Sequence, residues 1–347
     1  MVVRRQAVGI RDLARELGMS ISTVSRAMNA RPDVSPETQR LVRETAERLG
    51  YTPNQSGRSL RQGTTDTVAL VMPTHTARTE SGETFFLNVS DGLQEVLSPR
   101  GLNLVILPCG SAEQPDEFLF KAVDRHLADA IVLADTQRVD RRIDYLIEKK
   151  VPFVGLGRTE AGGYSWLDLD FEGVAAQSVD RLVGLGHRRI ALGTTDRTVN
   201  NTFLFLDSYR ASLERHGIGY DPELVIRVPD TRQGGYHLAA RLLAAPHRPT
   251  AVILEQETLA IGLYRALADA GLTPGRDLAV IGFRENPVLD LLTPSLTCFR
   301  VSLTNYGRRL GHLVLAEMAR AGSAGPLTQE VWPMELVSGD SDGAPLG

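Results

Sequence analysis

From Thr67 onward, short apolar runs alternate with stretches whose apolar residues recur at helical spacing. Because a strand, a helix and a second strand connect through a right-handed crossover, this alternation predicts parallel sheets flanked by helices. About 280 residues are enough for two such sheets, so we expect a two-lobed α/β core. A late helix over Leu303–Ala319 and a strand over Val331–Val337 are expected to cross back between the lobes. The other expected strands are Thr67–Met72, Leu102–Leu107, Ala130–Leu133, Phe153–Leu156, Arg189–Leu192, Leu224–Val228, Ala251–Leu254 and Leu278–Ile281.

The N-terminal segment has a different pattern, with three short helices and no strand. We expect the helices over Ile10–Leu17, over Ile21–Asn29, and from Pro36 until Gly50 ends the third. The turn Gly18-Met19-Ser20 joins the first two at a steep angle, because glycine tolerates the left-handed conformation that a tight turn requires. This arrangement is a helix-turn-helix, whose second helix can lie in the major groove of DNA.

The outer side of the second helix carries short hydroxyl side chains, one isoleucine and one arginine. Hydroxyls reach phosphates or base edges without bulk, Ile21 suits a thymine methyl group, and Arg26 can donate two hydrogen bonds to a guanine. Asn29, at the end of this helix, can serve a phosphate or a cap. The DNA-contacting residues that we expect are Arg11, Ser20, Ile21, Ser22, Thr23, Ser25, Arg26, Asn29, Ser35, Tyr51, Asn54, Gly57 and Leu60.

The net charge of −4 conceals an uneven division of charge along the chain. Residues 1–63 hold eleven Arg and no Lys against six acidic residues, a balance of +5, so the remainder carries −9. A basic module on an acidic body suits a polyanion-binding head, although a solvated basic helix face would have the same composition.

Composition also limits the cellular setting. No apolar run approaches the roughly 18 residues of a membrane span, and the N-terminus lacks the apolar segment of an export signal. Cys109 and Cys298 are far apart and have no partners at metal-ligand spacing. We therefore expect a cytoplasmic protein with free thiols, no metal and no cofactor.

A short linker separates the two patterns. Residues 53–64 can form one helix that is too short to be stable alone, and Gly57 weakens it by about 1 kcal/mol relative to alanine. Such a segment suits a switch element or a plain tether. We divide the chain into a headpiece (1–52), this linker (53–64), a core of two lobes (65–340) and, since its end is polar and glycine-rich, a flexible tail (341–347).

The headpiece sequence resembles that of LacI/GalR-type repressors. The resemblance lies in Val8–Asn29 with its TVSRxxN core, in Val34–Thr38, and in Leu49–Asn54 with its G-Y-x-P-N pattern. It extends into the core through four further segments: Val151–Val154, Leu185–Ala191, Leu278–Phe283 and Pro294–Thr297.

This resemblance implies a periplasmic-binding-protein-like core through which two chains pair, and a palindromic operator in double-stranded DNA. It also implies that the two linker helices pack into the minor groove, where Leu60 would insert between base steps and kink the duplex. Gly57 stands where the family usually has alanine, so we expect a linker that orders less readily.

The ligand pocket departs from the family pattern. Arg284 occupies the place of an aspartate that holds a sugar hydroxyl, Phe205 occupies the place of an arginine, and Glu255–Glu257 replaces an S-N-D run. Three interpretations remain open: an anionic sugar derivative bound by Arg284, a neutral sugar with Arg284 paired to Glu257 or Glu285, or a pocket that has lost its ligand.

Further pocket candidates are polar or aromatic residues that follow the expected strands, where ligands bind in α/β folds. Asp168 or Asp170 and Asn200 belong to this group, and Phe85 and Phe86 suit either core packing or stacking on a sugar. The residues that we expect to bind the ligand are Thr74, His75, Phe85, Phe86, Arg158, Arg197, Asn201, Phe205, Gln256, Phe283 and Arg284.

Catalytic motifs are missing from the sequence. It has no complete G-x-G-x-x-G, no phosphate loop, no H-E-x-x-H, no C-x-x-C and no G-x-S-x-G. We therefore expect a homodimeric repressor of carbohydrate genes rather than an enzyme. The alternative is a solute-binding protein of a sugar transport system, which shares the core fold but would carry an export signal and no basic head.

Overall fold

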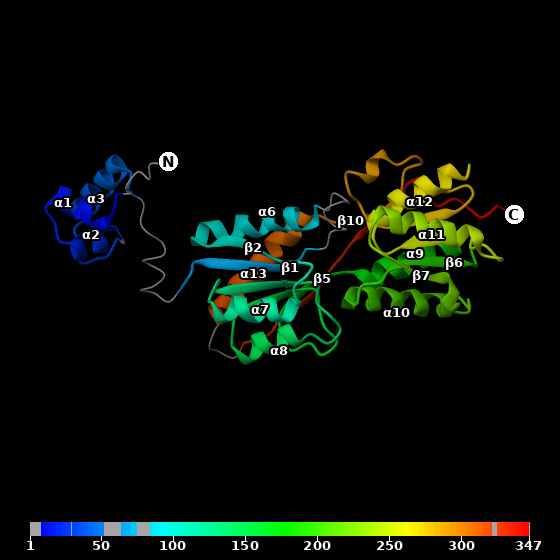
Figure 1. Ribbon diagram of the computed structural model, residues 1–347, viewed down its shortest axis with the longest axis horizontal. Coiled ribbons are helices and arrows are strands. Elements are labelled where there is room, and N and C mark those ends of the chain that lie inside the picture. The colour runs from blue at the N-terminus through cyan, green and yellow to red at the C-terminus, as the bar shows by residue number, and fades with distance from the viewer. Residues whose placement is uncertain (1–7, 29, 52–63, 75–83, 321–324, 347) are drawn as a thin grey trace. The chain divides into compact units, whose positions relative to one another are not determined.

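The computed structural model describes residues 8–28, 30–51, 64–74, 84–320 and 325–346. The chain forms two compact units, residues 1–65 and residues 66–347, and each is described by itself (Figure 1). Five predicted site residues lie outside the described residues: Asn29, Asn54, Gly57, Leu60 and His75. Most of the predicted linker, residues 53–64, lies outside them as well.

The headpiece consists of helices α1 (Ile10–Leu17), α2 (Ile21–Met28) and α3 (Pro36–Leu49). Gly18 and Gly50 end α1 and α3 at φ of 61° and 65°, a backbone region that glycine enters without a steric penalty. The three helices enclose a small core made of Leu13, Ala14, Val24, Ala27, Val42 and Ala46.

The second unit contains two six-stranded sheets, and the first of them defines lobe 1. Its strands run in the order β11-β5-β4-β3-β1-β2, and all their pairings are parallel. Their bounds are β1 (Thr67–Pro73), β2 (Asn103–Cys109), β3 (Ala130–Ala134), β4 (Phe153–Leu156), β5 (Trp166–Leu169) and β11 (Gln329–Trp332).

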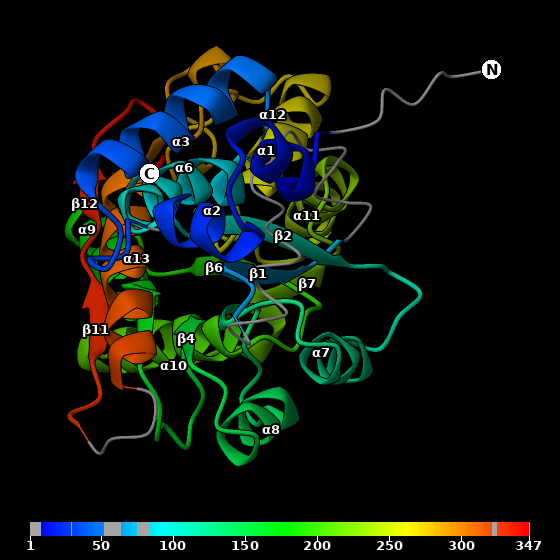
Figure 2. The same ribbon diagram turned by 90° about the vertical axis from the view of Figure 1, so that its left-hand side faces the viewer.

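Two pairs of helices cover the faces of this sheet. Alternate residues of β1 point to opposite faces, so Val68 and Leu70 pack in one cluster and Ala69 and Val71 in another. Helices α6 (Phe85–Leu97) and α13 (Leu303–Arg320) pack together on the first face, and α7 (Pro115–Asp124) and α8 (Arg141–Glu148) cover the second (Figure 2).

The second sheet defines lobe 2 and has the order β12-β10-β9-β8-β6-β7, in which only β12 runs antiparallel. The strands are β6 (Ile190–Thr195), β7 (Val225–Val228), β8 (Ala251–Leu254), β9 (Ala279–Arg284), β10 (Thr297–Arg300) and β12 (Glu335–Val337). Helices α9 (Phe171–Gly184) and α10 (Asn200–Arg215) cover one face, and α11 (Arg232–Ala244) and α12 (Glu257–Asp269) cover the other. Parallel strands flanked by helices in two lobes confirm the predicted α/β fold class.

The chain passes between the lobes at three places: between β5 and α9, between β10 and α13, and between β11 and β12. The last passage corrects the strand predicted over Val331–Val337. That segment is two strands in different sheets, because Pro333 lacks the N–H that a continuous ladder needs. β5 and β10 were not predicted.

The first residues of the C-terminal segment are anchored, which corrects the start of the flexible tail predicted over residues 341–347. Ser341 is fully buried, and its hydroxyl donates to the Val280 carbonyl at 2.6 Å. Asp342 accepts a hydrogen bond from the Thr297 hydroxyl at 2.7 Å and pairs with Arg181. Polar residues that find partners on β9, β10 and α9 order the segment in spite of its composition. None of the helices in the described part of the chain has the length and apolarity that crossing a membrane requires.

Candidate functional site

The outer side of α2 in the headpiece is accessible. Val24 and Ala27 are buried against the other two helices, and this fixes which side of α2 faces outward. Ile21, at 43% exposure, lies on that outer side with Ser22 and Arg26. The outer side of α2 thus presents an apolar group and a hydroxyl in its first turn and a guanidinium in its last turn, which suits recognition of base edges.

Arg26 makes a local ion pair in the free headpiece. Its Nη1 donates to Asp33 Oδ2 at 3.0 Å, and the two side chains are 51% and 54% exposed. Exposed pairs of this kind contribute little stability, so the guanidinium can exchange Asp33 for a base or a phosphate at little cost.

Two of the expected DNA contacts are helix caps. Ser20 Oγ accepts from the Thr23 N–H at 3.1 Å, and Ser35 Oγ accepts from the Thr38 N–H at 3.2 Å. Each therefore marks a helix N-terminus, where a phosphate binds favourably. Of the remaining expected contacts, Arg11 is exposed, and Thr23, Ser25 and Tyr51 are partly buried.

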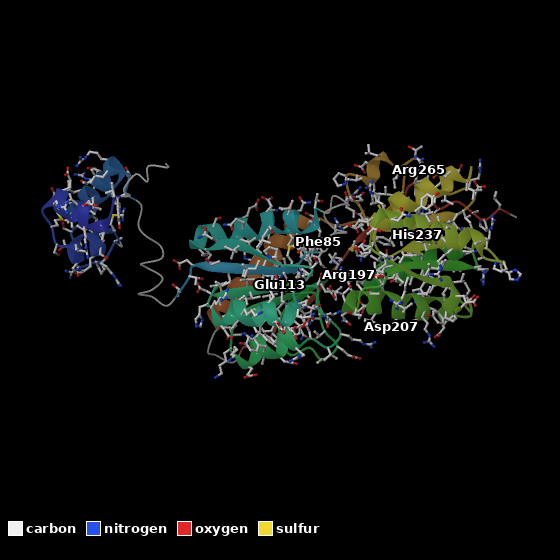
Figure 3. All side chains as sticks on the ribbon, in the orientation of Figure 1. Phe85, Glu113, Arg197, Asp207, His237 and Arg265 are labelled. Carbon is white, nitrogen blue, oxygen red and sulfur yellow. The ribbon has the colours of Figure 1, made fainter. Side chains whose placement is uncertain are left out.

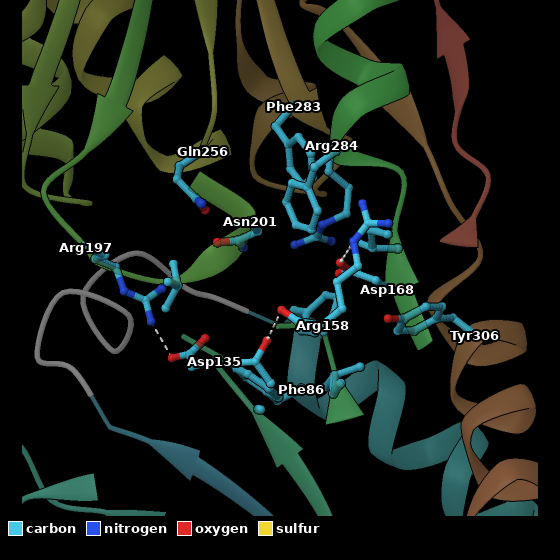
Figure 4. Close-up of a pocket in the computed structure, with 18 of the residues that line it drawn as sticks. Phe86, Asp135, Arg158, Asp168, Arg197, Asn201, Gln256, Phe283, Arg284 and Tyr306 are labelled. Atoms are coloured by element: carbon cyan, nitrogen blue, oxygen red, sulfur yellow. Dashed lines mark hydrogen bonds and ion pairs between the residues drawn. The ribbon is translucent and has the colours of Figure 1, made fainter. Parts of the chain in front are cut away.

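A pocket of about 740 Å³, its open mouth included, lies between the lobes of the second unit (Figures 3 and 4). It is built at the carboxyl ends of β3, β4, β6, β8 and β9, with contributions from β5, α6 and α13. The structure brings together the following residues named from the sequence: Phe85, Phe86, Arg158, Asp168, Arg197, Asn201, Gln256, Phe283 and Arg284.

Arg158 stands between two carboxylates. Its Nε lies 3.3 Å from Asp168 Oδ2, and its Nη2 donates to Glu172 on α9. The guanidinium also lies over the ring of Trp166, 5.2 Å from the centroid. Burial raises the pKa of Asp168 to about 7, against the opposing effect of Arg158. This carboxyl group can therefore change its protonation near neutral pH.

Arg284 has a carboxylate partner inside the pocket. Its Nη2 donates to Glu257 Oε1, and both side chains are only 5% exposed. The guanidinium lies 5.4 Å from the centroid of the Phe85 ring. Of the three interpretations of Arg284, this contact fits the one in which Glu257 neutralises it.

Phenyl rings form the apolar walls. Phe171 and Phe283 stack with centroids 5.0 Å apart, and Phe85 meets Phe86 edge to face at 5.2 Å. Phe205 is fully buried behind them, 6.3 Å from Phe283, and does not line the pocket. Its prediction as a ligand contact was wrong, because α10 turns this side chain into the core.

Thr74 is also not among the lining residues. Its hydroxyl donates to the Cys109 carbonyl at 2.9 Å, which ties the end of β1 to that of β2. A local structural bond thus occupies the hydroxyl that was expected to meet the ligand.

The loops after β3 and β6 join the two lobes beside the pocket. Arg197 forms an ion pair with Asp135, and the Asn200 N–H donates to the Thr136 carbonyl at 2.9 Å. The Asn200 side chain in turn donates to the Arg158 carbonyl at 2.9 Å. Asn200 therefore positions these loops and is not among the residues that line the pocket.

Some lining residues were missed from the sequence. Asp135 follows β3 directly and Arg158 lies two residues past β4, so the rule that selected Arg158 would also have selected Asp135. Tyr306 reaches the pocket from α13, and no local pattern signals this. In the described part of the chain, no three His, Cys, Asp or Glu side chains gather as metal ligands would.

The sequence is similar to known regulators along nearly its whole length. Residues 9–54 match the family described as bacterial regulatory proteins, lacI family, and residues 179–341 match a periplasmic binding protein-like domain. The HTH-type transcriptional regulator AglR of Rhizobium meliloti (strain 1021) is 31% identical over 343 residues, which span 97% of this chain and 94% of the relative.

Solved structures share the fold. A complex of the transcriptional regulator CelR with cellobiose superposes with a TM-score of 0.72 at 28% identity, covering 96% of this chain and 99% of that chain. The lac repressor dimer bound to operator and the anti-inducer ONPF gives a TM-score of 0.83 at 19% identity, covering 98% and 100% of the two chains. This second likeness shows a common fold only.

Proposed function

The chain belongs to the lacI family of bacterial regulatory proteins, and from this membership we propose that it represses carbohydrate uptake or catabolism genes as an operator-bound homodimer. The protein is a DNA-binding transcriptional regulator, and its place of action is the cytoplasm, where the operator is. A neutral carbohydrate in the pocket between the lobes controls operator binding. The outer side of α2 in each headpiece reads the operator.

The main support for a neutral carbohydrate ligand is that every guanidinium in the described lining of the pocket is paired with a carboxylate. Arg158, Arg197 and Arg284 each contact at least one carboxylate, so the described lining offers donors and acceptors side by side without excess positive charge. Hydroxyl groups both donate and accept, and phenyl rings suit the apolar face of a sugar ring. An anionic ligand would instead have to displace a buried carboxylate.

Apolar side chains on lobe 1 support pairing of two chains. Strand β2 is the edge of its sheet, and Val105 and Ile106 on it are 40% and 38% exposed. Leu87, on the neighbouring helix α6, is 64% exposed. An uncovered apolar edge strand favours association, and a second copy of the chain would cover it. The lac repressor structure is that of a dimer, which supports pairing of two chains.

Control of DNA binding follows from linkage. Residues of both lobes line the pocket, so a ligand stabilises one arrangement of the lobes over another. If the two arrangements differ in operator affinity, ligand and operator change each other's binding by the same factor.

A thermal-shift panel tests the ligand class. Neutral mono- and disaccharides are compared with the corresponding uronic acids and sugar phosphates at one ionic strength. We expect stabilisation by at least one neutral sugar, and loss of that response in Asp168→Asn but not in Thr74→Ala, whose hydroxyl lies outside the lining. Stabilisation by anions alone, or by no sugar, would contradict the proposal.

Operator binding is tested by enriching genomic fragments on the intact protein, followed by retardation of the selected duplex. Affinity should fall steeply as salt rises, because each neutralised phosphate releases counterions. The sugar found in the thermal-shift panel should then change the retardation. A selected duplex with a flat salt response would argue against headpiece binding.

A further inference from the structure

Asp135 and Arg197 stand where two cavities adjoin. Both residues line the ligand pocket, and both also line a second cavity of about 1140 Å³, its mouth included. Pro115, Arg142 and Asp230 line only this outer cavity. The ion pair between Asp135 and Arg197 thus lies on the boundary of the two spaces, with side chains that are 13% and 16% exposed.

The pair joins the two lobes. Asp135 directly follows β3 of lobe 1, and Arg197 follows β6 of lobe 2. In the close-up, the dashed contact between them lies across the pocket from Tyr306 (Figure 4). A ligand that extends from the inner pocket in this direction meets the pair before it reaches the outer cavity.

The backbone holds Asp135 in this position. Its φ is 54°, in the left-handed region, and its carbonyl accepts from Arg142 Nη2 at 2.8 Å. Arg142 is itself buried and paired with Asp140 at 2.6 Å. The buried Arg142–Asp140 pair thus holds the loop from which the Asp135 carboxylate faces Arg197. The position of this carboxylate is therefore set within lobe 1.

We propose that the Asp135–Arg197 ion pair is a gate that sets the length of the ligand. The inference rests on the proposed carbohydrate pocket and assigns specificity to these two residues. A short saccharide fits behind the closed pair, against Arg158, Asp168 and Gln256. A longer saccharide reaches the outer cavity only when its hydroxyls replace the contact between Asp135 and Arg197.

Thiol labelling tests the gate without requiring that the ligand be known. Gln256→Cys places a thiol in the inner pocket, since Gln256 lines that pocket and not the outer cavity. The native Cys109 and Cys298 are buried, and burial raises the pKa of both thiols, so they react slowly. The rate of modification is measured with methyl methanethiosulfonate and with a bulky biotin-linked methanethiosulfonate.

The gate is opened by Asp135→Asn combined with Arg197→Ala. Asparagine tolerates the left-handed backbone at this position, and the double change removes both charges of the Asp135–Arg197 pair. The matched control is Glu160→Gln, which removes the nearby exposed pair with Arg138; neither of these residues lines either cavity. Circular dichroism and thermal unfolding check that each variant is folded.

We expect the ratio of the bulky to the small reagent's rate to rise about tenfold in the gate variant, since a charge-assisted contact no longer has to open. The ratio should not change in Glu160→Gln. An unchanged ratio in the gate variant, or an equal rise in the control, overturns the proposal. So does an introduced thiol that neither reagent reaches in any variant. Absence of sugar binding would instead contradict the proposed function, so the two failures are distinguishable.

Discussion

The buried pair between Arg284 and Glu257 allows a quantitative test of how the pocket is held together. Arg284→Met keeps the length of the side chain and removes its charge. Glu257 would then lose this guanidinium while its side chain stays only 5% exposed. Since breaking a buried ion pair on one side costs about 3–5 kcal/mol, we expect the core unit to lose that much stability.

The double variant separates the loss of pairing from the loss of packing. Arg284→Met with Glu257→Leu removes both charges and fills the space with apolar atoms. Apolar replacement of a buried pair is often neutral, so most of the lost stability should return, to within about 1–2 kcal/mol of the parent. Arg300→Met is the matched control, because it breaks the Arg300–Glu285 pair, whose side chains are 55% and 36% exposed. That change should cost less than about 1 kcal/mol.

Urea unfolding followed by tryptophan fluorescence measures these differences. Trp166 and Trp332 both belong to the core unit, so the signal does not report on the headpiece. All variants are compared at one protein concentration, because pairing of chains would contribute to the apparent stability. If Arg284→Met loses less than about 1 kcal/mol, or if the double variant loses as much as the single one, the pair does not neutralise Arg284 as argued.

Three further predictions concern the headpiece, the pH response and the C-terminal segment. Arg26→Ala should relax operator preference at one base pair by about 1–3 kcal/mol in retardation assays with single-base variants, and unchanged preference would remove Arg26 from base recognition. The pKa of Asp168 is raised from 3.8 to about 7 in the fold, so the folded state binds the extra proton and stability should fall as pH rises from about 4 to about 7. Asp168→Asn should flatten this part of the urea-midpoint profile, and an identical profile would contradict the assignment. Asp342→Asn should lower the core's stability by about 1–3 kcal/mol, since it removes the charge that pairs with Arg181 inside the protein. A urea midpoint equal to that of the unchanged protein would show that the Asp342–Arg181 contact does not contribute to stability.

The headpiece was predictable because its signals are local. The first helix spans Ile10–Leu17 as predicted, since Gly18 ends it through a conformation that depends on the residue itself. The start of α3 depends in the same way on Ser35 as N-cap and Pro36 as first residue. These helix ends depend only on residues that are neighbours in the sequence, so the local sequence pattern is enough to predict them.

The pocket was predictable only in part, because its contacts join residues that are far apart in sequence. Arg284 is the last residue of β9, and its family position placed it correctly in the pocket, but its partner Glu257 lies 27 positions away and remained one of several possibilities. Phe205 shows the opposite error. Its spacing of four from the buried Tyr209 puts both on the inner face of α10, and this helical period was a better guide than the family position.

The arrangement of charge in the pocket bears on how a sugar can act as a signal. Among the described residues, two ion pairs cross from one lobe to the other, Arg158 with Glu172 and Arg197 with Asp135, beside the hydrogen bonds of Asn200. When the lobes separate, water solvates these groups, so the cost of removing that water on closure offsets much of the attraction within each pair. The free protein is then not locked in the closed arrangement. To change the ratio of closed to open protein from 1:99 to 99:1, the ligand must bind the closed arrangement about 5.5 kcal/mol more tightly than the open one. A saccharide that makes several hydrogen bonds across both lobes, each contributing about 0.5–1.5 kcal/mol, supplies that amount. A ligand bound to one lobe alone supplies none of it, so contact with both sheets is what makes a bound sugar a signal.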